Sequence, residues 1–162
     1  MTEAFVGFYW TRPVTLIGFR TLPEDAEGAA ASSKTIKYQK ERVRRHVQEI
    51  GGKLVAEVAF LDTQPDRSTN AIRDALLKVQ KLCANHKATM VYVNFQEVAQ
   101  GRRNWWLLGG IEDLGIKAEA LSPNPLPIDG RLFDPIQHFQ NWSRRHYQIL
   151  EQLEKDALAG LK

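Results

Sequence analysis

The chain has 162 residues, 43% of them hydrophobic and 25% charged, and its formal net charge is +3 at pH 7. This length and composition indicate one ordinary globular domain, and the absence of any run of about eighteen apolar residues excludes a membrane-spanning helix. The single cysteine, Cys83, excludes an internal disulfide, and the four dispersed histidines form no metal-binding motif, so we expect neither a metal nor another cofactor.

The first predicted element is the run 5–10, Phe-Val-Gly-Phe-Tyr-Trp. A short, apolar and aromatic run that is soon followed by Pro13 predicts a strand buried on both faces. Such strands lie in the middle of parallel sheets, and the residues that follow them lie at the carboxyl edge, where open α/β folds hold their chemistry. Thr11 and Arg12 take this place and are the first candidate catalytic residues. No basic segment followed by a long apolar one precedes them, so we expect no signal peptide and a cytoplasmic location.

Residues 14–33 contain Pro23 and Gly28 and show no consistent period, so we expect an inserted flap and loop. Connections of this length are typically either functional or disordered, and the sequence leaves both readings open.

A helix is predicted from an N-cap at Ser33 or Thr35 to the glycine pair 51–52. Its apolar stripe consists of Ile36, Val43, Val47 and Ile50. The outward face carries a set of basic residues: Lys37, Lys40, Arg42, Arg44 and Arg45. Such a set is either a solvated helix face or a surface that contacts nucleic-acid phosphates.

Strand and helix patterns then alternate along the chain. Apolar runs at 54–61, 89–95 and 116–121 predict strands, and three- and four-residue apolar spacing predicts helices at 69–85 and 104–115. Alternation of this kind implies right-handed crossovers. We therefore expect an α/β fold with three layers, built on a doubly wound, mostly parallel sheet of four or five strands.

The last 41 residues divide into a proline-rich linker, 122–134, and an amphipathic helix, 135–162, which Asp134 and Pro135 open. A helix of about 26 residues is about 39 Å long and exceeds the width of a small sheet domain. We expect part of it to overhang and to bury its stripe against a second copy of the chain, giving a homodimer. The alternative is a helix that lies wholly on its own sheet.

These elements carry a family resemblance. The segment 36–43, the glycine pair before a strand that ends at Asp62, the helix that opens near Arg73 and the strand that ends at Phe95 together resemble the catalytic domain of serine recombinases of the resolvase and invertase type. The resemblance covers about 5–121, which makes 1–121 a resolvase-like domain. It implies that the closing helix corresponds to the long dimerisation helix of that family.

The resemblance also implies which residues to test for chemistry. In that family the first strand ends in a tyrosine, x, arginine, x, serine motif, whose serine attacks a DNA phosphate. The like positions here are Phe8, Trp10 and Arg12, and no serine occurs before Ser32. Thr11 supplies a hydroxyl in the same stretch, but a threonine without an activating base is a weak nucleophile.

The family's second catalytic segment, leucine, aspartate, arginine, leucine, x, arginine, corresponds to 95–100, Phe-Gln-Glu-Val-Ala-Gln. All three charged positions differ, and Glu97 places a negative charge where a guanidinium would meet phosphate. Asp62 and Arg73, with Arg67 as the second choice of arginine, remain in family-like places. Thr11, Arg12, Asp62 and Arg73 are thus the candidate catalytic residues, and we expect no recombinase activity.

Three functions follow as hypotheses. The first is a dimerising or regulatory module with weak, salt-dependent nucleic-acid binding through Lys37, Lys40, Arg44, Arg45, Arg102 and Arg103. The second is an enzyme or binder acting on a small phosphorylated ligand at the carboxyl edge, where Tyr9 would join Arg12, Asp62, Arg73, Arg102 and Arg103. The third is a domain that holds a protein partner through the long helix, the flap after Pro13 and the pair 105–106, two tryptophans that fit a helix core as well as a binding platform. None of the three involves a membrane.

Overall fold

A computed structural model describes residues 2–11, 26–61, 70–95 and 105–138, together with the isolated Gln152 and Lys155. Its elements follow one another in the order β1 (Ala4–Thr11), α1 (Ala26–Ser32), α2 (Lys34–Glu49), β2 (Lys53–Leu61), α3 (Asn70–His86), β3 (Thr89–Val93), α4 (Trp105–Asp113), β4 (Ala118–Leu121), β5 (Leu126–Ile128) and β6 (Arg131–Phe133). The strands and helices expected at 54–61, 69–85, 89–95, 104–115 and 116–121 are therefore present, with small shifts of their ends.

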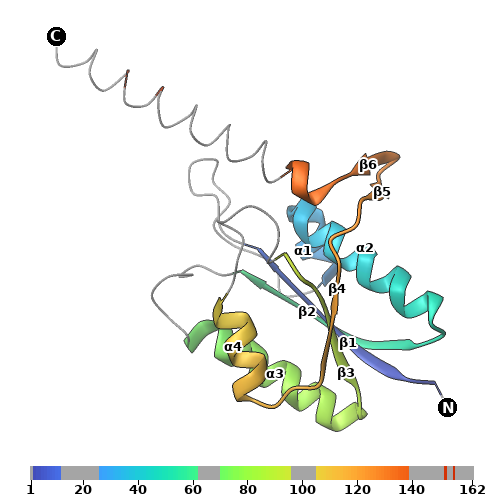
Figure 1. Cartoon of the computed structure of the whole chain (residues 1–162), viewed down its shortest axis with the longest axis vertical. Helices are drawn as coiled ribbons and strands as arrows, with labels where there is room; N and C mark the ends of the chain where they lie inside the picture. The colour runs from blue at the N-terminus through green and yellow to red at the C-terminus, as the bar shows by residue number, and fades with distance from the viewer. Residues whose placement is uncertain are drawn as a thin grey trace.

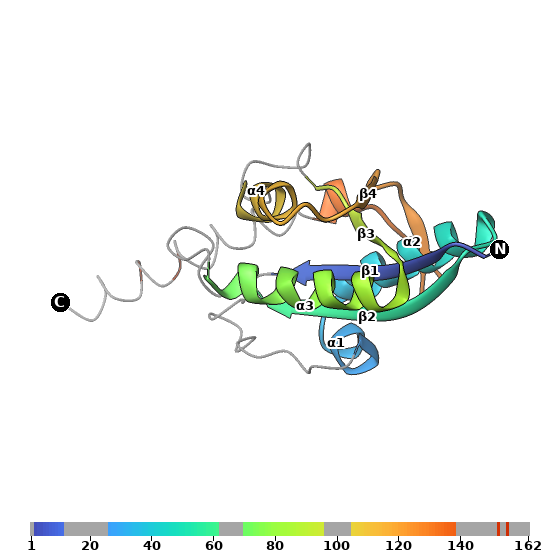
Figure 2. The same cartoon turned by 90° about the horizontal axis from the view of Figure 1, so that it is seen from below.

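Strands β1 to β4 form one sheet in the order β2-β1-β3-β4, and every neighbouring pair is parallel. Helix α2 covers one face of this sheet and α3 and α4 cover the other, while α1 packs beside α2 and β2 (Figures 1 and 2). The predicted α/β fold with a mostly parallel sheet is confirmed. The central place of the first strand is confirmed too, since β1 lies between β2 and β3 and its side chains are almost all buried.

Helix α2 begins as the sequence suggests. Ser33 is the N-cap, and its Oγ accepts a hydrogen bond from the Ile36 N–H at 3.3 Å. The stripe residues Ile36, Val43 and Val47 are buried. Ile50 is not part of the stripe, because it is the C-cap residue, where the helical backbone has already ended, and its side chain is 49% exposed.

Two segments expected to lack regular structure are ordered elements. Residues 26–32, placed in the loop 14–33, form helix α1, since alanine is the best helix former and Ala29 and Ala30 are buried. Within the expected linker 122–134, β5 and β6 pair as an antiparallel hairpin. Its turn is Asp129-Gly130, and both residues have positive φ, which is the geometry that a two-residue hairpin turn requires.

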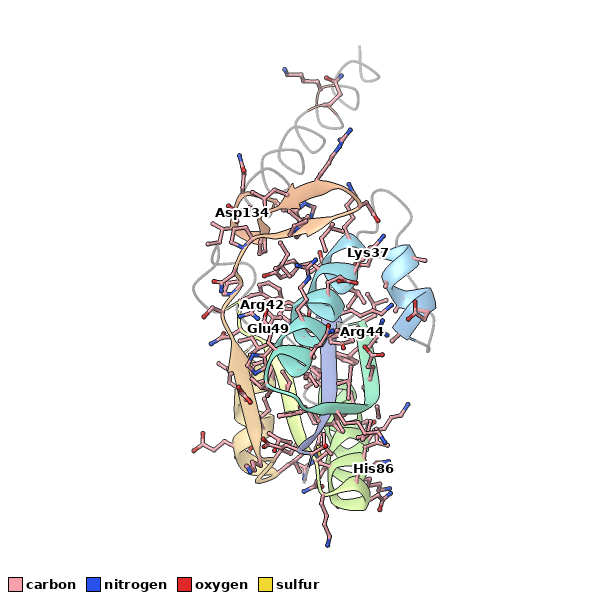
Figure 3. The ribbon with its side chains drawn as sticks, turned by 90° about the vertical axis from the view of Figure 1, so that its right-hand side faces the viewer. Lys37, Arg42, Arg44, Glu49, His86 and Asp134 are labelled. Carbon is pink, nitrogen blue, oxygen red and sulfur yellow. The ribbon has the colours of Figure 1, made fainter. Side chains whose placement is uncertain are left out.

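The segment 122–133, which we call the strap, is fastened along α2. Lys37 Nζ lies 2.6 Å from Asp129 Oδ1, the Tyr38 hydroxyl donates to the Asn124 carbonyl, and Arg42 Nε donates to the Ser122 carbonyl at 3.0 Å. Figure 3 shows Lys37 next to the hairpin and Arg42 on the side of α2 that faces the strap. The strap therefore packs on the sheet domain, where the sequence had indicated a spacer.

Residues 135–138 are helical, which agrees with a helix that opens at Asp134 and Pro135. Apart from Gln152 and Lys155, the rest of the predicted helix 135–162 lies outside the described residues. Among the residues that the structure describes, no helix is both long enough and apolar enough to cross a membrane.

Candidate functional site

The carboxyl edge of the sheet opens between β1 and β3. The β1–β2 pairing continues to Thr11 and Leu61, whereas the β1–β3 pairing ends earlier, at Phe8 and Tyr92. The crossover from β1 leads to β2 and the one from β2 leads to β3, so the chain reverses its direction of winding between β1 and β3. In doubly wound sheets a point of this kind is where ligands bind.

The side chain of Gln39 occupies this opening. It projects from α2, is fully buried, and bonds to β1 at Trp10, beyond the point where the pairing of β1 with β3 ends. Its Oε1 accepts from the Trp10 N–H at 3.0 Å, and its Nε2 donates to the Trp10 carbonyl at 2.7 Å and to the Thr35 carbonyl at 3.2 Å. The carboxamide thus offers β1 the donor and acceptor of a neighbouring strand, and it fixes α2 to the sheet.

Of the four candidate catalytic residues, the structure describes Thr11 and Arg73. Thr11 ends β1 with its side chain buried, and Arg73 is exposed on α3. Arg12 and Asp62 lie outside the described residues, as do the anion-contact candidates Arg102 and Arg103.

The Tyr9 hydroxyl points away from the carboxyl edge, toward the amino end of β1. Gly7 pairs with Glu57 across β1 and β2, and the Tyr9 ring leans over Gly7 so that its hydroxyl donates to Glu57 Oε2 at 2.6 Å. Gly7 is required for this, because a Cβ there would lie 2.5 Å from the Tyr9 oxygen. The Tyr9 hydroxyl thus has a carboxylate partner on β2, while Arg12, Arg102 and Arg103, with which the sequence grouped it, lie outside the described residues.

A chain of charged side chains continues from Glu57. Arg44 holds that carboxylate through two bonds, Nε to Oε2 at 3.0 Å and Nη2 to Oε1 at 2.7 Å. The same Nη2 lies 3.0 Å from Glu27 Oε1 on α1, and Lys40 Nζ lies 2.7 Å from that oxygen. We call this set, Tyr9, Glu57, Arg44, Glu27 and Lys40, the Glu57 network.

The network shifts the titration of its members. Burial raises the pKa of Tyr9, and the hydrogen bond to Glu57 raises it further. Burial opposes ionisation of Glu57, but the hydrogen bonds from Arg44 and Tyr9 outweigh it and the pKa of this carboxyl is lowered. The bonds from Lys40 and Arg44 also lower the pKa of Glu27. Both carboxylates are therefore ionised at neutral pH, and each cation of the network has an anion beside it.

The basic face predicted for α2 is divided by these contacts. The prediction that Lys40 faces outward is wrong, because its side chain is only 8% exposed and forms an ion pair with Glu27. Arg44 lies on the side of α2 that faces β2 and α1 (Figure 3), where it holds both acidic partners. Lys37 is joined to the strap, and exposed Arg45 lies 3.8 Å from Glu41. Four of the five basic side chains predicted on this face, Lys37, Lys40, Arg44 and Arg45, therefore have a carboxylate of the same chain beside them.

Glu27 and Glu57 were not predicted from the sequence as members of a site. Glu57 left a signal, since it is the one charge inside the apolar run 54–61, and a charge in a half-buried strand needs a partner. Glu27 left none, because its contacts join elements that only the fold brings together. Gln39 lies in the segment 36–43 that carries the family resemblance, but its bonds to Trp10 were not predicted.

Among the residues that the structure describes, Cys83 and His46 lie apart from the Glu57 network. Burial raises the pKa of the Cys83 thiol, which favours the unreactive form. His46 Nε2 lies 2.8 Å from Glu119 Oε1 and joins α2 to β4. Over the described ranges, no three His, Cys, Asp or Glu side chains are grouped so that they could hold a metal ion.

Comparisons of the chain with protein-family models, with curated proteins and with solved structures find no match. Its function must therefore be inferred from its own residues.

Proposed function

We propose that this chain is a resolvase-like module that does not cleave DNA and that works as a dimer formed through its C-terminal helix. The observation that carries the proposal is a pair of exposed apolar side chains where that helix begins. Leu132 on β6 is 72% exposed, and Ile136, the first residue of the predicted apolar stripe, is 43% exposed. The stripe therefore starts on a surface that its own domain leaves uncovered, and a second copy of the chain supplies a matching one.

The contacts of the sheet domain support the loss of cleavage. Strand cleavage needs an accessible nucleophile and cations that meet the developing phosphate charge. The Thr11 side chain is buried, and the cations of Lys40 and Arg44 already hold carboxylates. Weak, salt-dependent contact with nucleic acid remains part of the proposal, since the net charge is +3.

Measurement of mass in solution by light scattering across a dilution series tests the dimer. We expect the wild type to dimerise and Leu132→Lys or Ile136→Lys to raise the dissociation constant about tenfold or more, because each buries a charge in an apolar interface. Ile50→Lys is the matched control. Ile50 is also an exposed apolar residue, at 49%, but it lies at the C-terminal end of α2, whereas the hairpin contacts Lys37 at the N-terminal end. A monomeric wild type, or an equal effect of all three changes, would refute the dimer.

Incubation with supercoiled plasmid tests the loss of cleavage separately. We expect no nicking and no covalent adduct between protein and DNA. An adduct that survives denaturation would show that a nucleophile still acts, whatever the result for the dimer.

A further inference from the structure

Both cations of the Glu57 network meet at a single oxygen atom. Lys40 Nζ lies 2.7 Å and Arg44 Nη2 lies 3.0 Å from Glu27 Oε1. An ammonium and a guanidinium that converge on one oxygen define a position for a negatively charged oxygen. In this structure a carboxylate of the same chain stands at that position.

The two carboxylates of the network are held very differently. Glu57 is 16% exposed, stands in the middle of β2, and is bound by both Tyr9 and Arg44. Glu27 is 73% exposed, and the apolar side chains buried by its seven-residue helix α1 are alanines, Ala29 and Ala30. Glu57 is thus a fixed member of the network, whereas Glu27 is held mainly by the two cations.

The connection between α1 and α2 is also slight. Ser33 alone separates the two helices, with an extended backbone at φ −143° and ψ 120°. A change of the backbone angles at this one residue would move α1 relative to α2, and the contacts of Gln39 do not involve Ser33.

If Glu27 moved away, the network would keep a net positive charge. The remaining members, Lys40, Arg44 and Glu57, carry two positive charges and one negative charge. The Lys40 side chain is only 8% exposed, and a buried ammonium without a counter-ion is strongly unfavourable. An anion from solution that brings several acceptor oxygens would restore the balance.

We propose that Lys40 and Arg44 form a binding site for a phosphate group and that Glu27 occupies it as an internal competitor, so that α1 controls access to the site. The chemical class is a phosphate monoester or diester, whose oxygens suit a guanidinium and an ammonium together. This site lies under α1 on the α2 face and does not depend on the proposed dimer.

Thermal unfolding in inorganic phosphate, against chloride at equal ionic strength, tests the site. Glu27→Gln removes the competing charge and keeps the shape of the side chain. We expect a lower midpoint in chloride, recovery as phosphate is added, and an apparent affinity for phosphate about tenfold or more above that of the wild type. Glu41→Gln is the matched control, because it removes the same charge from an exposed pair with Arg45.

A second substitution separates a specific site from a general effect of salt. Adding Lys40→Met to Glu27→Gln removes the ammonium, so the response to phosphate should fall to that of Glu41→Gln. Equal responses of Glu27→Gln and Glu41→Gln, or an undiminished response of the double variant, would overturn the proposal.

A labelled DNA duplex identifies the source of the phosphate group. If nucleic acid is the ligand, Glu27→Gln should bind the duplex more tightly than the wild type, with a steeper dependence on salt. A response to inorganic phosphate with unchanged duplex binding would assign the site to a small phosphorylated molecule.

Discussion

Replacement of Gln39 by leucine tests whether this side chain completes the sheet. The change keeps the volume of the side chain and removes both functional groups of the carboxamide. The Trp10 N–H loses the acceptor 3.0 Å away, and the Trp10 carbonyl loses the donor 2.7 Å away.

The cost follows from burial. A buried main-chain group that loses its partner costs about 1–3 kcal/mol, so two groups cost roughly 2–6 kcal/mol. Burial of a leucine in place of a polar amide offsets about 1–2 kcal/mol of this. We therefore expect the free energy of unfolding to fall by about 1–4 kcal/mol.

Urea unfolding followed by circular dichroism measures this loss. With an m-value of about 2 kcal/mol/M, a loss of 3 kcal/mol lowers the midpoint by about 1.5 M. Gln48→Leu is the control, because Gln48 is exposed near the end of the same helix. A loss below about 1 kcal/mol, or one equal to that of Gln48→Leu, would refute the view that Gln39 stands in for a strand.

Three further outcomes are expected. Arg44→Met should lower the free energy of unfolding by about 2–3 kcal/mol, because it leaves the largely buried Glu57 carboxylate without its cation. Arg45→Met should change it by less than about 0.5 kcal/mol, since its ion pair is exposed, and equal losses in urea would contradict the network. Gly7→Ala should cost about 1–3 kcal/mol in the wild type. The cost should be smaller in a Tyr9→Phe background, because the contact at 2.5 Å with the hydroxyl is removed and the ring carbon at 2.9 Å remains; additive losses in a double-mutant cycle would argue against the contact. Burial raises the pKa of Tyr9, and it raises the pKa of Tyr38 to about 12. Because the folded state favours the neutral phenols, their contribution to stability is complete below about pH 10 and is lost as the pH rises through the folded pKa values. Phenolate absorbance at about pH 11 should be lower in the folded protein than in urea, and identical absorbance would refute this.

The fold could be predicted where one local signal was enough. The aromatic run of β1 and the alternation of strand and helix patterns determine which strand is central and that the sheet is parallel. The hairpin also left a signal, Asp129-Gly130, but the surrounding prolines favoured an extended linker. Helix α1 was hidden because Gly28 interrupts a short alanine-rich segment whose helix is completed by packing on α2 and β2.

The site could be predicted far less well. The helical pattern correctly placed Lys40 and Arg44 on one helix. It could not show that Glu27 on α1 would form ion pairs with both of them. Whether a cation faces solvent or an internal partner depends on tertiary contacts, and a helical pattern contains no information about these. The resemblance to serine recombinases directed attention to the carboxyl edge, where Arg12 and Asp62 lie outside the described residues.

The fastening of the strap on α2 bears on how force passes through the molecule. Lys37 and Tyr38 on one turn of α2 and Arg42 on the next hold the strap, so a movement of the strap would act on that helix. A force applied to the strap would therefore reach α2. Because Gln39 joins that helix to Trp10, the same force would reach β1, the central strand of the sheet.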